Sequence, residues 1–497
     1  MFHSNGKYPL HAYRVGGFFY RKYNLFTYTL TMKTIKDDFP IFKNNPDLIY
    51  LDSASTLMKP QVVIDAVSDY LSQDYANIHR GNYDLSLKSE ELYEQARSTV
   101  AKFIWANDES EVIFTSNSTD SVNILAQSLL VSQLIKKGDN IVVSELEHHA
   151  NALPRQLVAE RTWAELRWIP VGIDGVLDVE LVKKNIDSNT KIIALSACSN
   201  VTGRVWLEEV WDLSRRLNQS LGDGWSWTPL SAPQTSPLER GEENSPLAPR
   251  WEGGKRSGSF PWVVVDASQA VVHEKIDVRE MGCDFCFFTW HKLGALTGIG
   301  VLWWKKEHLK VLKPGKVGGG AVEQVTATHV QYLASPDKFE PGTPNVVGAI
   351  SLGVAIEYLE KERQWEREES AVTDRAFVDS TLSFEEELKR YCLEQFRLLE
   401  DTGKITLLGG YEAQKKIGVF SFVPHGVSAL AIDQAMGREG IAIRTGAHCT
   451  HIYHTKLTED PSCMLEKSVR MSFWMYTEMS DVERFFEVLK VALWYRL

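Results

Sequence analysis

Short apolar runs alternate with amphipathic stretches along most of this chain. Stretches of helical period separate most of these runs, and one of them, residues 118–138, closes with Gly138. Strands that alternate with helices predict a mostly parallel sheet whose two faces are covered by helices. The seven runs rich in β-branched and aromatic residues, which predict strands, are EVIFTS (111–116), NIVVSE (140–145), LRWIPV (166–171), KIIALSA (191–197), WVVVDAS (262–268), DFCFFT (284–289) and IGVLWW (299–304).

Polar residues follow five of the predicted strands. The carboxyl ends of parallel strands meet at one edge of a sheet, where the binding sites of such proteins lie. We therefore expect these side chains to meet in one site. They are Ser118 with Thr119, His148, Asn200, Asp266 and Lys292.

Three stretches depart from this pattern and predict the domain organisation. Residues 1–34 are basic and aromatic at first and lack the apolar core of a secretory signal, so we expect a disordered N-terminal extension. Residues 219–260 are rich in Pro, Gly and Ser, which indicates a low-complexity surface insertion in a large domain of residues 35–344. Long helical patterns followed by short apolar runs then predict a smaller α+β domain at residues 345–497.

Composition excludes several classes of protein. The net charge is −11 and no basic stripe is present, which argues against a nucleic-acid partner. No apolar run approaches the roughly 18 residues of a membrane span, so we expect no membrane partner. Six cysteines among 497 residues do not resemble a disulfide framework. A reducing cytoplasm is therefore the expected location.

Lys292 lies between two apolar runs, where an unpaired ammonium would be costly. A lysine at a strand end can extend to water, but it can also be held as a Schiff base. Pyridoxal phosphate requires such a lysine and an acid that keeps its pyridine nitrogen protonated. Asp266 follows a neighbouring strand, and Ser118 and Thr119 begin a predicted helix, whose N-terminus suits a phosphate.

Several motifs together resemble one family. The chain is similar to the class V aminotransferases of PLP fold type I, and among them to the SufS-type cysteine desulfurases. This resemblance implies an α/β fold with a large PLP-binding domain and a smaller C-terminal domain. The motifs that carry the resemblance are YLDSAST, NIHRGNYDLS, SELEHHANALPRQ, CSNVTG, VVVDASQAVVH, DVREMGCDFCFFTWHK, TGIGVLW, KFEPGTPNVVGAI and IAIRTGAHC.

The resemblance also implies a role for individual residues. It implies a homodimer with a shared active site, because one phosphate contact would come from the neighbouring subunit. It implies no metal ligand. The implied roles are Lys292 as Schiff-base lysine, Asp266 at the pyridine nitrogen, Gln269 at the phenolic oxygen, His148 stacked on the ring, Ser118, Thr119, Thr289 and His291 at the phosphate, Thr343 at the phosphate of the neighbouring subunit, Asn200 and Arg470 at the substrate carboxylate, and Cys449 as sulfur acceptor with Arg444 beside it.

The implied activity is conversion of L-cysteine to L-alanine with a persulfide on Cys449, which would pass sulfur to an acceptor protein for iron–sulfur cluster assembly or another sulfur-transfer pathway. A free thiol needs help to ionise, and Arg444 and His448 are the expected sources of that help. Two alternatives remain. One is another class V activity, such as an aminotransferase, a selenocysteine lyase or an epimerase. The other is a degenerate PLP-fold protein without turnover.

Some positions depart from the family pattern. Trp290 replaces a glycine just before the His291–Lys292 pair, and we expect its indole either to displace a neighbouring group or to narrow the pocket. Ala447 stands where the family usually has histidine. The spacing of His448, His451 and His454 beside Cys449 resembles a metal set, but no strict motif is present, so we expect a loop without metal. Cys198 precedes Asn200 and is expected to be a core residue.

Overall fold

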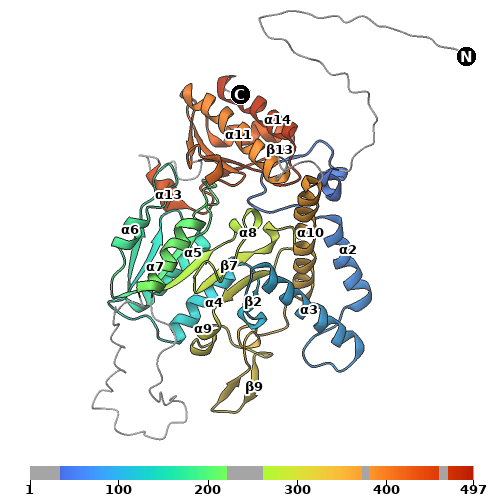
Figure 1. Cartoon of the computed structure of the whole chain (residues 1–497), viewed down its shortest axis with the longest axis vertical. Helices are drawn as coiled ribbons and strands as arrows, with labels where there is room; N and C mark the ends of the chain where they lie inside the picture. The colour runs from blue at the N-terminus through green and yellow to red at the C-terminus, as the bar shows by residue number, and fades with distance from the viewer. Residues whose placement is uncertain (1–33, 221–260, 372–379, 458–467, 496–497) are drawn as a thin grey trace, which may run out of the picture. The chain divides into compact units, whose positions relative to one another are not determined.

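The computed structural model describes residues 34–220, 261–371, 380–457 and 468–495 (Figure 1). Apart from residues 34, 219 and 220, the predicted N-terminal extension and insertion lie outside these residues. The division of the chain into two domains at residue 345 remains a prediction. We describe here the part that begins at Ile35.

All seven predicted strands form one seven-stranded sheet in the order β2-β8-β7-β6-β5-β3-β4. Only β8 is antiparallel to its neighbours, so the prediction of a mostly parallel sheet is confirmed. The strands are β2 (Val112–Thr115), β3 (Asn140–Ser144), β4 (Glu165–Ile169), β5 (Thr190–Ser196), β6 (Trp262–Asp266), β7 (Phe285–Thr289) and β8 (Gly300–Trp304).

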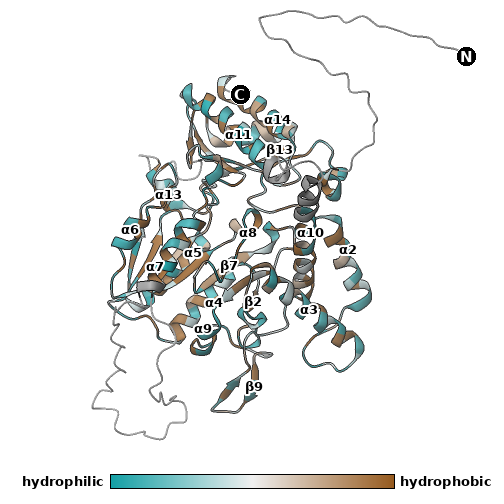
Figure 2. Cartoon of the chain, in the orientation of Figure 1, coloured by the Kyte–Doolittle hydropathy of each residue, from teal (hydrophilic) through white to brown (hydrophobic). Residues whose placement is uncertain are grey.

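Helices cover both faces of this sheet. Successive side chains of a strand point to opposite faces, and they enter different cores here. Ile141 and Val143 pack with α4, α5 and α9, whereas Val142 belongs to the core shared by α3, α7 and α10. Figure 2 shows apolar residues along the strands and mixed polar and apolar residues along the helices. The helices of this part are α1 (Pro40–Asn44), α2 (Gln61–Asp69), α3 (Asp84–Phe103), α4 (Ser118–Val131), α5 (His149–Thr162), α6 (Val179–Lys184), α7 (Leu207–Ser220), α8 (Ala270–His273), α9 (Lys306–Val311) and α10 (Val346–Ala371).

A second, four-stranded antiparallel sheet has the order β11-β12-β15-β14. The helices α11, α12 and α14 pack on it, and their apolar residues form a core with those of the sheet. Its elements are α11 (Ser380–Asp401), β11 (Ile405–Leu408), β12 (Val419–Pro424), α12 (Ala429–Arg438), β14 (Arg444–Gly446), α13 (His451–Lys456), β15 (Ser468–Ser472) and α14 (Met479–Tyr495).

The structure differs from the predicted elements in a few places. The helix predicted to reach Gly138 ends at Val131, because Gln133 adopts the left-handed backbone conformation (φ 53°) that commonly ends a helix. The sequence analysis missed β11 and the hairpin of β9 (Val322–Val325) and β10 (Val330–Tyr332). It also missed β1 (Ile49–Tyr50), which pairs with β13 (Ile441–Ala442).

The β1–β13 pairing brings the segment that follows β1 to the edge where the large sheet ends. The Asp52 backbone bridges to Ser472, and the Leu57 amide donates to the His291 carbonyl at 2.9 Å. Residues 52–59 therefore lie between the second sheet and the residues that follow β7.

Candidate active site

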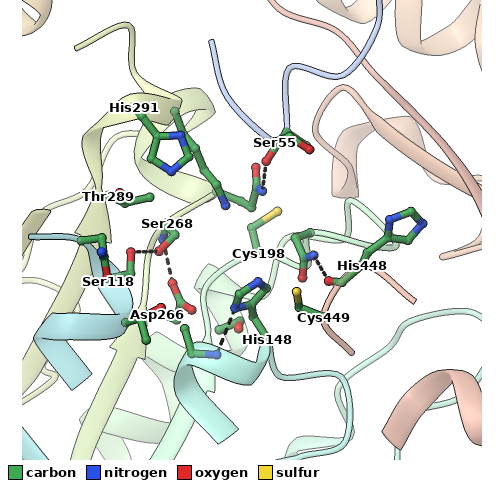
Figure 3. Close-up of a pocket in the computed structure, with 18 of the residues that line it drawn as sticks. Ser55, Ser118, His148, Cys198, Asp266, Ser268, Thr289, His291, His448 and Cys449 are labelled. Atoms are coloured by element: carbon green, nitrogen blue, oxygen red, sulfur yellow. Dashed lines mark hydrogen bonds between the residues drawn. The ribbon is translucent and has the colours of Figure 1, made fainter. Parts of the chain in front are cut away.

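A pocket of about 580 Å³ lies at the carboxyl ends of β2, β3, β5, β6 and β7 (Figure 3). Every predicted site residue except Thr343 lines it. The prediction that the strand-end residues meet in one site is therefore confirmed. The lining includes Ser118, Thr119, His148, Asn200, Asp266, Gln269, Thr289, His291 and Lys292 from the region of the large sheet, and Arg444, Cys449 and Arg470 from the C-terminal region.

One end of the pocket is rich in hydrogen-bond donors. Asn117 caps α4, and its Oδ1 accepts from the Asp120 amide at 2.9 Å. Ser118 Oγ lies 2.8 Å from Ser268 Oγ. Thr289 Oγ1 and His291 Nδ1 are buried and have no hydrogen-bond partner among the described residues. Two orphaned polar atoms beside a helix N-terminus fit the phosphate of the predicted cofactor.

Gly300, the first residue of β8, allows the Asn117 turn to approach the sheet. A Cβ atom at this position would lie 2.6 Å from Asn117 Cα and 2.8 Å from Thr115 Oγ1. Such distances are shorter than van der Waals contact, so a larger residue would displace the turn that begins α4. The glycine thus helps to place Ser118 and Thr119 at the pocket.

Asp266 ends β6 at the base of the pocket. Its Oδ1 accepts from the Ser268 amide at 2.9 Å. Burial raises the pKa of this carboxyl, whereas the Ser268 hydrogen bonds and the charge of Lys292 act in the opposite direction. A buried carboxylate is stabilised by a positive partner, and a protonated pyridine nitrogen would be one. Asp266 therefore fits its predicted position at the cofactor ring.

Lys292 ends the 3-10 turn Trp290–Lys292 that follows β7. Burial lowers the pKa of its ammonium to about 8, although Asp266 partly opposes this shift. The peptide before Lys292 is held firmly, because the His291 carbonyl accepts from Leu57 N at 2.9 Å, Thr56 Oγ1 at 3.1 Å and Lys59 Nζ at 3.2 Å. A readily deprotonated amine on an anchored peptide suits a lysine that bonds to a carbonyl group.

His148 precedes α5 and its ring lies in the pocket (Figure 3). Its Nδ1 accepts from the Ala150 amide at 3.0 Å, so the proton of the neutral ring is on Nε2. Burial and the charge of Lys292 lower the pKa of His148 to about 3. The ring is therefore neutral at physiological pH, which suits stacking on an aromatic cofactor.

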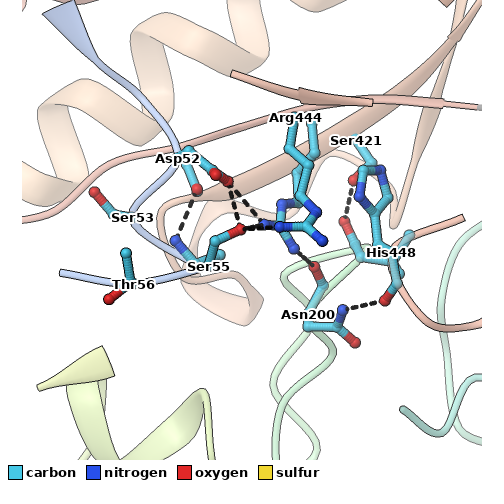
Figure 4. A network of polar contacts seen from close by, with 12 residues as sticks. Asp52, Ser53, Ser55, Thr56, Asn200, Ser421, Arg444 and His448 are labelled. Carbon is cyan, nitrogen blue, oxygen red and sulfur yellow. Dashed lines mark hydrogen bonds and ion pairs between the residues drawn. The ribbon is translucent and has the colours of Figure 1, made fainter. Parts of the chain in front are cut away.

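Arg470 on β15 makes hydrogen bonds within a polar network that includes Asp52, Ser55 and Asn200, which Figure 4 labels. Its Nη2 lies 3.0 Å from Asp52 Oδ1 and 2.7 Å from Ser55 Oγ, and its Nη1 donates to the Asn200 carbonyl at 3.0 Å. Arg444 Nη1 also donates to Ser55 Oγ, at 3.0 Å. The sequence analysis did not assign Asp52 or Ser55, although both lie in the quoted motif YLDSAST.

Cys449 follows β14 in a turn with unusual backbone geometry. His448 and Cys449 both have positive φ, 46° and 60°, in a region that residues other than glycine seldom adopt. Strained backbone of this kind often occurs at functional sites. The Cys449 carbonyl accepts from the His149 amide at 2.8 Å, which ties the turn to α5.

The structure does not support help from a positive charge on His448 in ionising Cys449. The His448 ring is buried, and its Nε2 lies 3.0 Å from Ser468 Oγ. Burial lowers the pKa of His448 well below its usual value, with Arg470 acting in the same direction. The ring is neutral and supplies no positive charge to a thiolate. Arg444 lines the same pocket as Cys449 and remains the expected source of positive charge for its thiolate.

Of the two outcomes expected for Trp290, narrowing of the pocket does not occur, because Trp290 does not line the pocket. Its side chain is fully buried, and its ring packs on Phe288 and Phe103 at centroid distances of 4.8 and 6.1 Å. It points into the core and not into the pocket. Cys198, by contrast, belongs to the core as expected but also lines the pocket.

The remaining predicted residues differ in their surroundings. Gln269 Nε2 donates to the Ala54 carbonyl at 2.9 Å. Thr343 is exposed and does not line this pocket. In the part of the chain that the structure describes, no group of three or more His, Cys, Asp and Glu side chains could hold a metal. His451 instead stacks on His149, with ring centroids 4.8 Å apart.

The fold and the pocket are typical of one class of protein, and a match of the sequence to a protein-family model identifies that class. The chain belongs to the aminotransferase class-V family, whose model matches residues 49–220 and 257–485. This membership confirms the predicted family, the fold and the pyridoxal phosphate cofactor, and the orphaned donors and buried carboxylate of the pocket fit that group.

Curated relatives of the chain carry a more particular name. A probable cysteine desulfurase of Vibrio cholerae serotype O1 is 34% identical over 468 residues, which are 93% of this chain and 99% of the relative. A cysteine desulfurase of Enterobacter sp. strain 638 is 32% identical over 463 residues, 92% of this chain and 97% of the relative.

Solved structures agree with these relatives. The apo cysteine desulfurase of Thermococcus onnurineus NA1 superposes with a TM-score of 0.74 and 28% identity, covering 93% of this chain and 98% of the other. The cysteine desulfurase CsdA of Escherichia coli superposes with a TM-score of 0.69 and 28% identity, covering 95% and 99%. Among the described residues, no helix is long and apolar enough to span a membrane.

Proposed function

We propose that this chain is a pyridoxal phosphate-dependent cysteine desulfurase that converts L-cysteine to L-alanine and leaves a persulfide on Cys449. One observation carries the proposal: the Lys292 amine and the Cys449 thiol line the same pocket. Transamination needs the lysine and not the thiol, whereas sulfur transfer needs both. The names of the curated relatives support the same activity.

The residues around the pocket would hold the cofactor as the sequence predicts. Lys292 would attach it covalently, Asp266 would keep its pyridine nitrogen protonated, and His148 would stack on its ring. Gln269 would donate to its phenolic oxygen. The phosphate would lie among Ser118, Thr119, Thr289 and His291, two of which have orphaned polar atoms.

When bound, the cofactor supplies an electron sink for the substrate carbons. Arg470 and Asn200 would hold the substrate carboxylate, and this places the substrate sulfur toward Cys449. The Lys292 amine, with a pKa of about 8, would take the Cα proton. Such a residue acts as a base most effectively when its pKa lies near the working pH.

The sulfur transfer is a substitution at the substrate sulfur. The Cys449 thiolate attacks this atom, an S–S bond forms, and the Cβ–S bond breaks with its electron pair retained on the carbon side. Protons added to the carbon skeleton complete L-alanine. Arg444 would stabilise the thiolate, because a guanidinium beside a thiol favours the charged form.

We also propose a homodimer. Seven large apolar side chains between residues 62 and 87 are exposed, which is more than a monomer usually leaves in water over so short a stretch. Thr343 is exposed as well, as a residue that reaches a neighbouring subunit would be in an isolated chain. Light scattering after gel filtration tests the proposal, and a monomer would contradict it. The exposed side chains are Val62, Ile64, Leu71, Tyr75, Tyr83, Leu85 and Leu87.

The persulfide would be consumed by a sulfur-acceptor protein in the cytoplasm, for iron–sulfur cluster assembly or another sulfur-transfer pathway. A cysteine-bound persulfide is reducible by thiols, so a thiol of the acceptor is sufficient to receive the sulfur.

The large domain of residues 35–344 would carry the cofactor, and the small domain of residues 345–497 would carry the Cys449 turn.

The experiment measures alanine and sulfide released from L-cysteine by the purified protein with pyridoxal phosphate and a reductant. Cys449→Ser is the matched variant, because it replaces one atom and removes the acceptor. The proposal expects both products from the parent and no sulfide from the variant. A yellow parent protein that releases neither product would contradict it.

A further inference from the structure

The turn that carries Cys449 is held at every backbone carbonyl. The Ala447 carbonyl accepts from Thr450 N and Thr450 Oγ1, both at 2.8 Å, and the Thr450 carbonyl accepts from the His454 amide at 3.1 Å. The Cys449 carbonyl accepts from the His149 amide at 2.8 Å. The backbone of the turn is therefore fixed by its own helix and by α5.

Residues more distant in the sequence donate to the two remaining carbonyls of the turn. The His448 carbonyl accepts from Asn200 Nδ2 at 2.8 Å, and the Gly446 carbonyl accepts from Ser468 Oγ at 3.0 Å. Asn200 also accepts from Arg470 through its own carbonyl, at 3.0 Å. The turn is thus joined directly to the residues that would bind the substrate carboxylate.

Beneath the turn, two buried imidazoles meet at one hydroxyl. Ser468 Oγ lies 3.0 Å from His448 Nε2 and 2.9 Å from His454 Nε2. His454 Nδ1 lies 2.9 Å from Thr450 Oγ1, so the second imidazole also contacts the first residue after Cys449. The exposed fractions of His448, His454 and Ser468 are 5%, 0% and 0%.

The protons of this group can be arranged so that the three contacts of Ser468 are satisfied together. A serine hydroxyl has one proton and two lone pairs. Ser468 can donate to the Gly446 carbonyl while it accepts an N–H from each Nε2. His448 can make this contact as a neutral imidazole, which agrees with its lowered pKa.

The turn needs this support because its backbone is strained. His448 and Cys449 have φ of 46° and 60°, and residues other than glycine keep such angles only where the surrounding structure imposes them. His454 and Ser468 supply part of that constraint. Without it, the chain would relax toward ordinary backbone angles and the thiol would leave its position in the pocket.

We propose that His454 and Ser468 are positioning residues for the Cys449 nucleophile. They touch neither substrate nor cofactor, and they act by fixing the turn in the conformation that aims the thiol at the substrate sulfur. The proposal rests on the proposed function. It concerns only the sulfur-transfer step and not cofactor binding or substrate entry.

The test separates sulfur transfer from substrate binding in the full-length protein loaded with cofactor. Persulfide on Cys449 is measured by mass spectrometry in a single turnover with L-cysteine. Binding of L-alanine, which needs Lys292 but no thiol, is measured from the absorbance of the bound cofactor. For His454→Ala we expect persulfide formation to slow about 100-fold, because a displacement of about 1 Å has such effects. L-Alanine binding should change less than about twofold, as for a substitution that does not reach the site.

Three further variants and one control make the test more specific. His454→Gln keeps an amide nitrogen near the position of Nε2 and should restore much of the persulfide rate, whereas His454→Asn, whose amide is too short to reach Ser468, should not. Ser468→Ala should resemble His454→Ala. The matched control is His425→Ala, which removes an exposed imidazole that contacts Thr406 outside the pocket and should leave both measurements unchanged.

Equal losses of L-alanine binding and persulfide formation in His454→Ala would overturn the proposal, since they would show a general structural role. Unchanged persulfide formation would overturn it as well. If His454→Ala does not fold, the comparison of His454→Gln with His454→Asn decides in its place. A parent protein that forms no persulfide would instead contradict the proposed function, so the two failures are distinguishable.

Discussion

Arg470 and Asp52 form an ion pair of 3.0 Å although they lie 418 residues apart in the chain. The pair joins the second sheet to the segment after β1, and it gives the buried guanidinium a counter-charge. In the proposed role of Arg470, a substrate carboxylate would share the guanidinium with Asp52. The affinity for substrate would then depend on this competition as well as on the arginine itself.

Replacing Arg470 by lysine should weaken substrate binding. Lysine keeps the charge but loses the planar fork that contacts Asp52, Ser55 and Asn200. Loss of one charged hydrogen bond, worth about 1.5–3 kcal/mol, predicts a rise of about 10- to 150-fold in KM for L-cysteine. The dissociation constant of pyridoxal phosphate, measured by absorbance, should stay nearly constant. A large fall in cofactor affinity would contradict the assignment of Arg470 to the substrate.

The pH dependence of cofactor attachment should report the lowered pKa of Lys292. Only the neutral amine attacks a carbonyl, and burial lowers this pKa from 10.5 to about 8. The rate at which the apoprotein gains the absorbance of bound cofactor should therefore rise about tenfold per pH unit below pH 8 and level off above it. Stopped-flow absorbance between pH 6 and 10 measures this, with Lys292→Ala as the blank. A rate that keeps rising to pH 10 would show an ordinary lysine.

The stability of the apoprotein should fall in acid partly because of His148. Its pKa is 6.5 when unfolded and about 3 when folded, so between these values the unfolded chain binds a proton that the folded chain does not. The free energy of unfolding therefore falls as the pH falls through this window, by about 1.4 kcal/mol per pH unit from this residue. His148→Gln should show a shallower fall between pH 6.5 and 4.5 in denaturant unfolding. The control is His329→Gln, an exposed histidine outside the pocket; an identical slope for the parent and His148→Gln would refute the prediction.

Shortening Trp290 should affect stability and not catalysis. Its ring fills the core between Phe288 and Phe103, so Trp290→Phe leaves unfilled volume there. We expect a loss of about 1–3 kcal/mol in the free energy of unfolding. KM for L-cysteine should remain that of the parent, because the indole does not line the pocket. A changed KM with unchanged stability would show that Trp290 acts on the pocket after all.

Much of the fold could be predicted from local pattern. The seven strands of the large sheet are short, apolar and bounded by helical stretches, and each was found within a few residues of its observed position. Elements without such a pattern were missed. The hairpin β9–β10 is largely exposed, with Val325 at 60% exposed, so no apolar alternation identifies it. The two residues of β1 are too few to show any period.

The direction of Trp290 could not be predicted, because it follows the last residue of β7 where the chain enters a 3-10 turn. The alternation of a strand ends at that point, so position in the sequence no longer determines the face. The supporting residues Asp52, Ser55 and Ser468 were missed for another reason, because contacts that local pattern does not reveal give each of them its place. His454 was noted only for its spacing from His448 and His451, which did not indicate its contact with Ser468.

The sequence by itself determined which polar residues end the strands of the large sheet, and hence that Ser118, His148, Asn200, Asp266 and Lys292 lie at one edge. That inference succeeds because parallel strands share the direction of their carboxyl ends. Only the tertiary structure decided that Cys449 and Arg470 face the same pocket, that His448 is neutral and turned toward Ser468, and that Arg470 is paired with Asp52. These features arise from burial and from contacts between segments that lie between 20 and 418 residues apart, which local pattern does not encode.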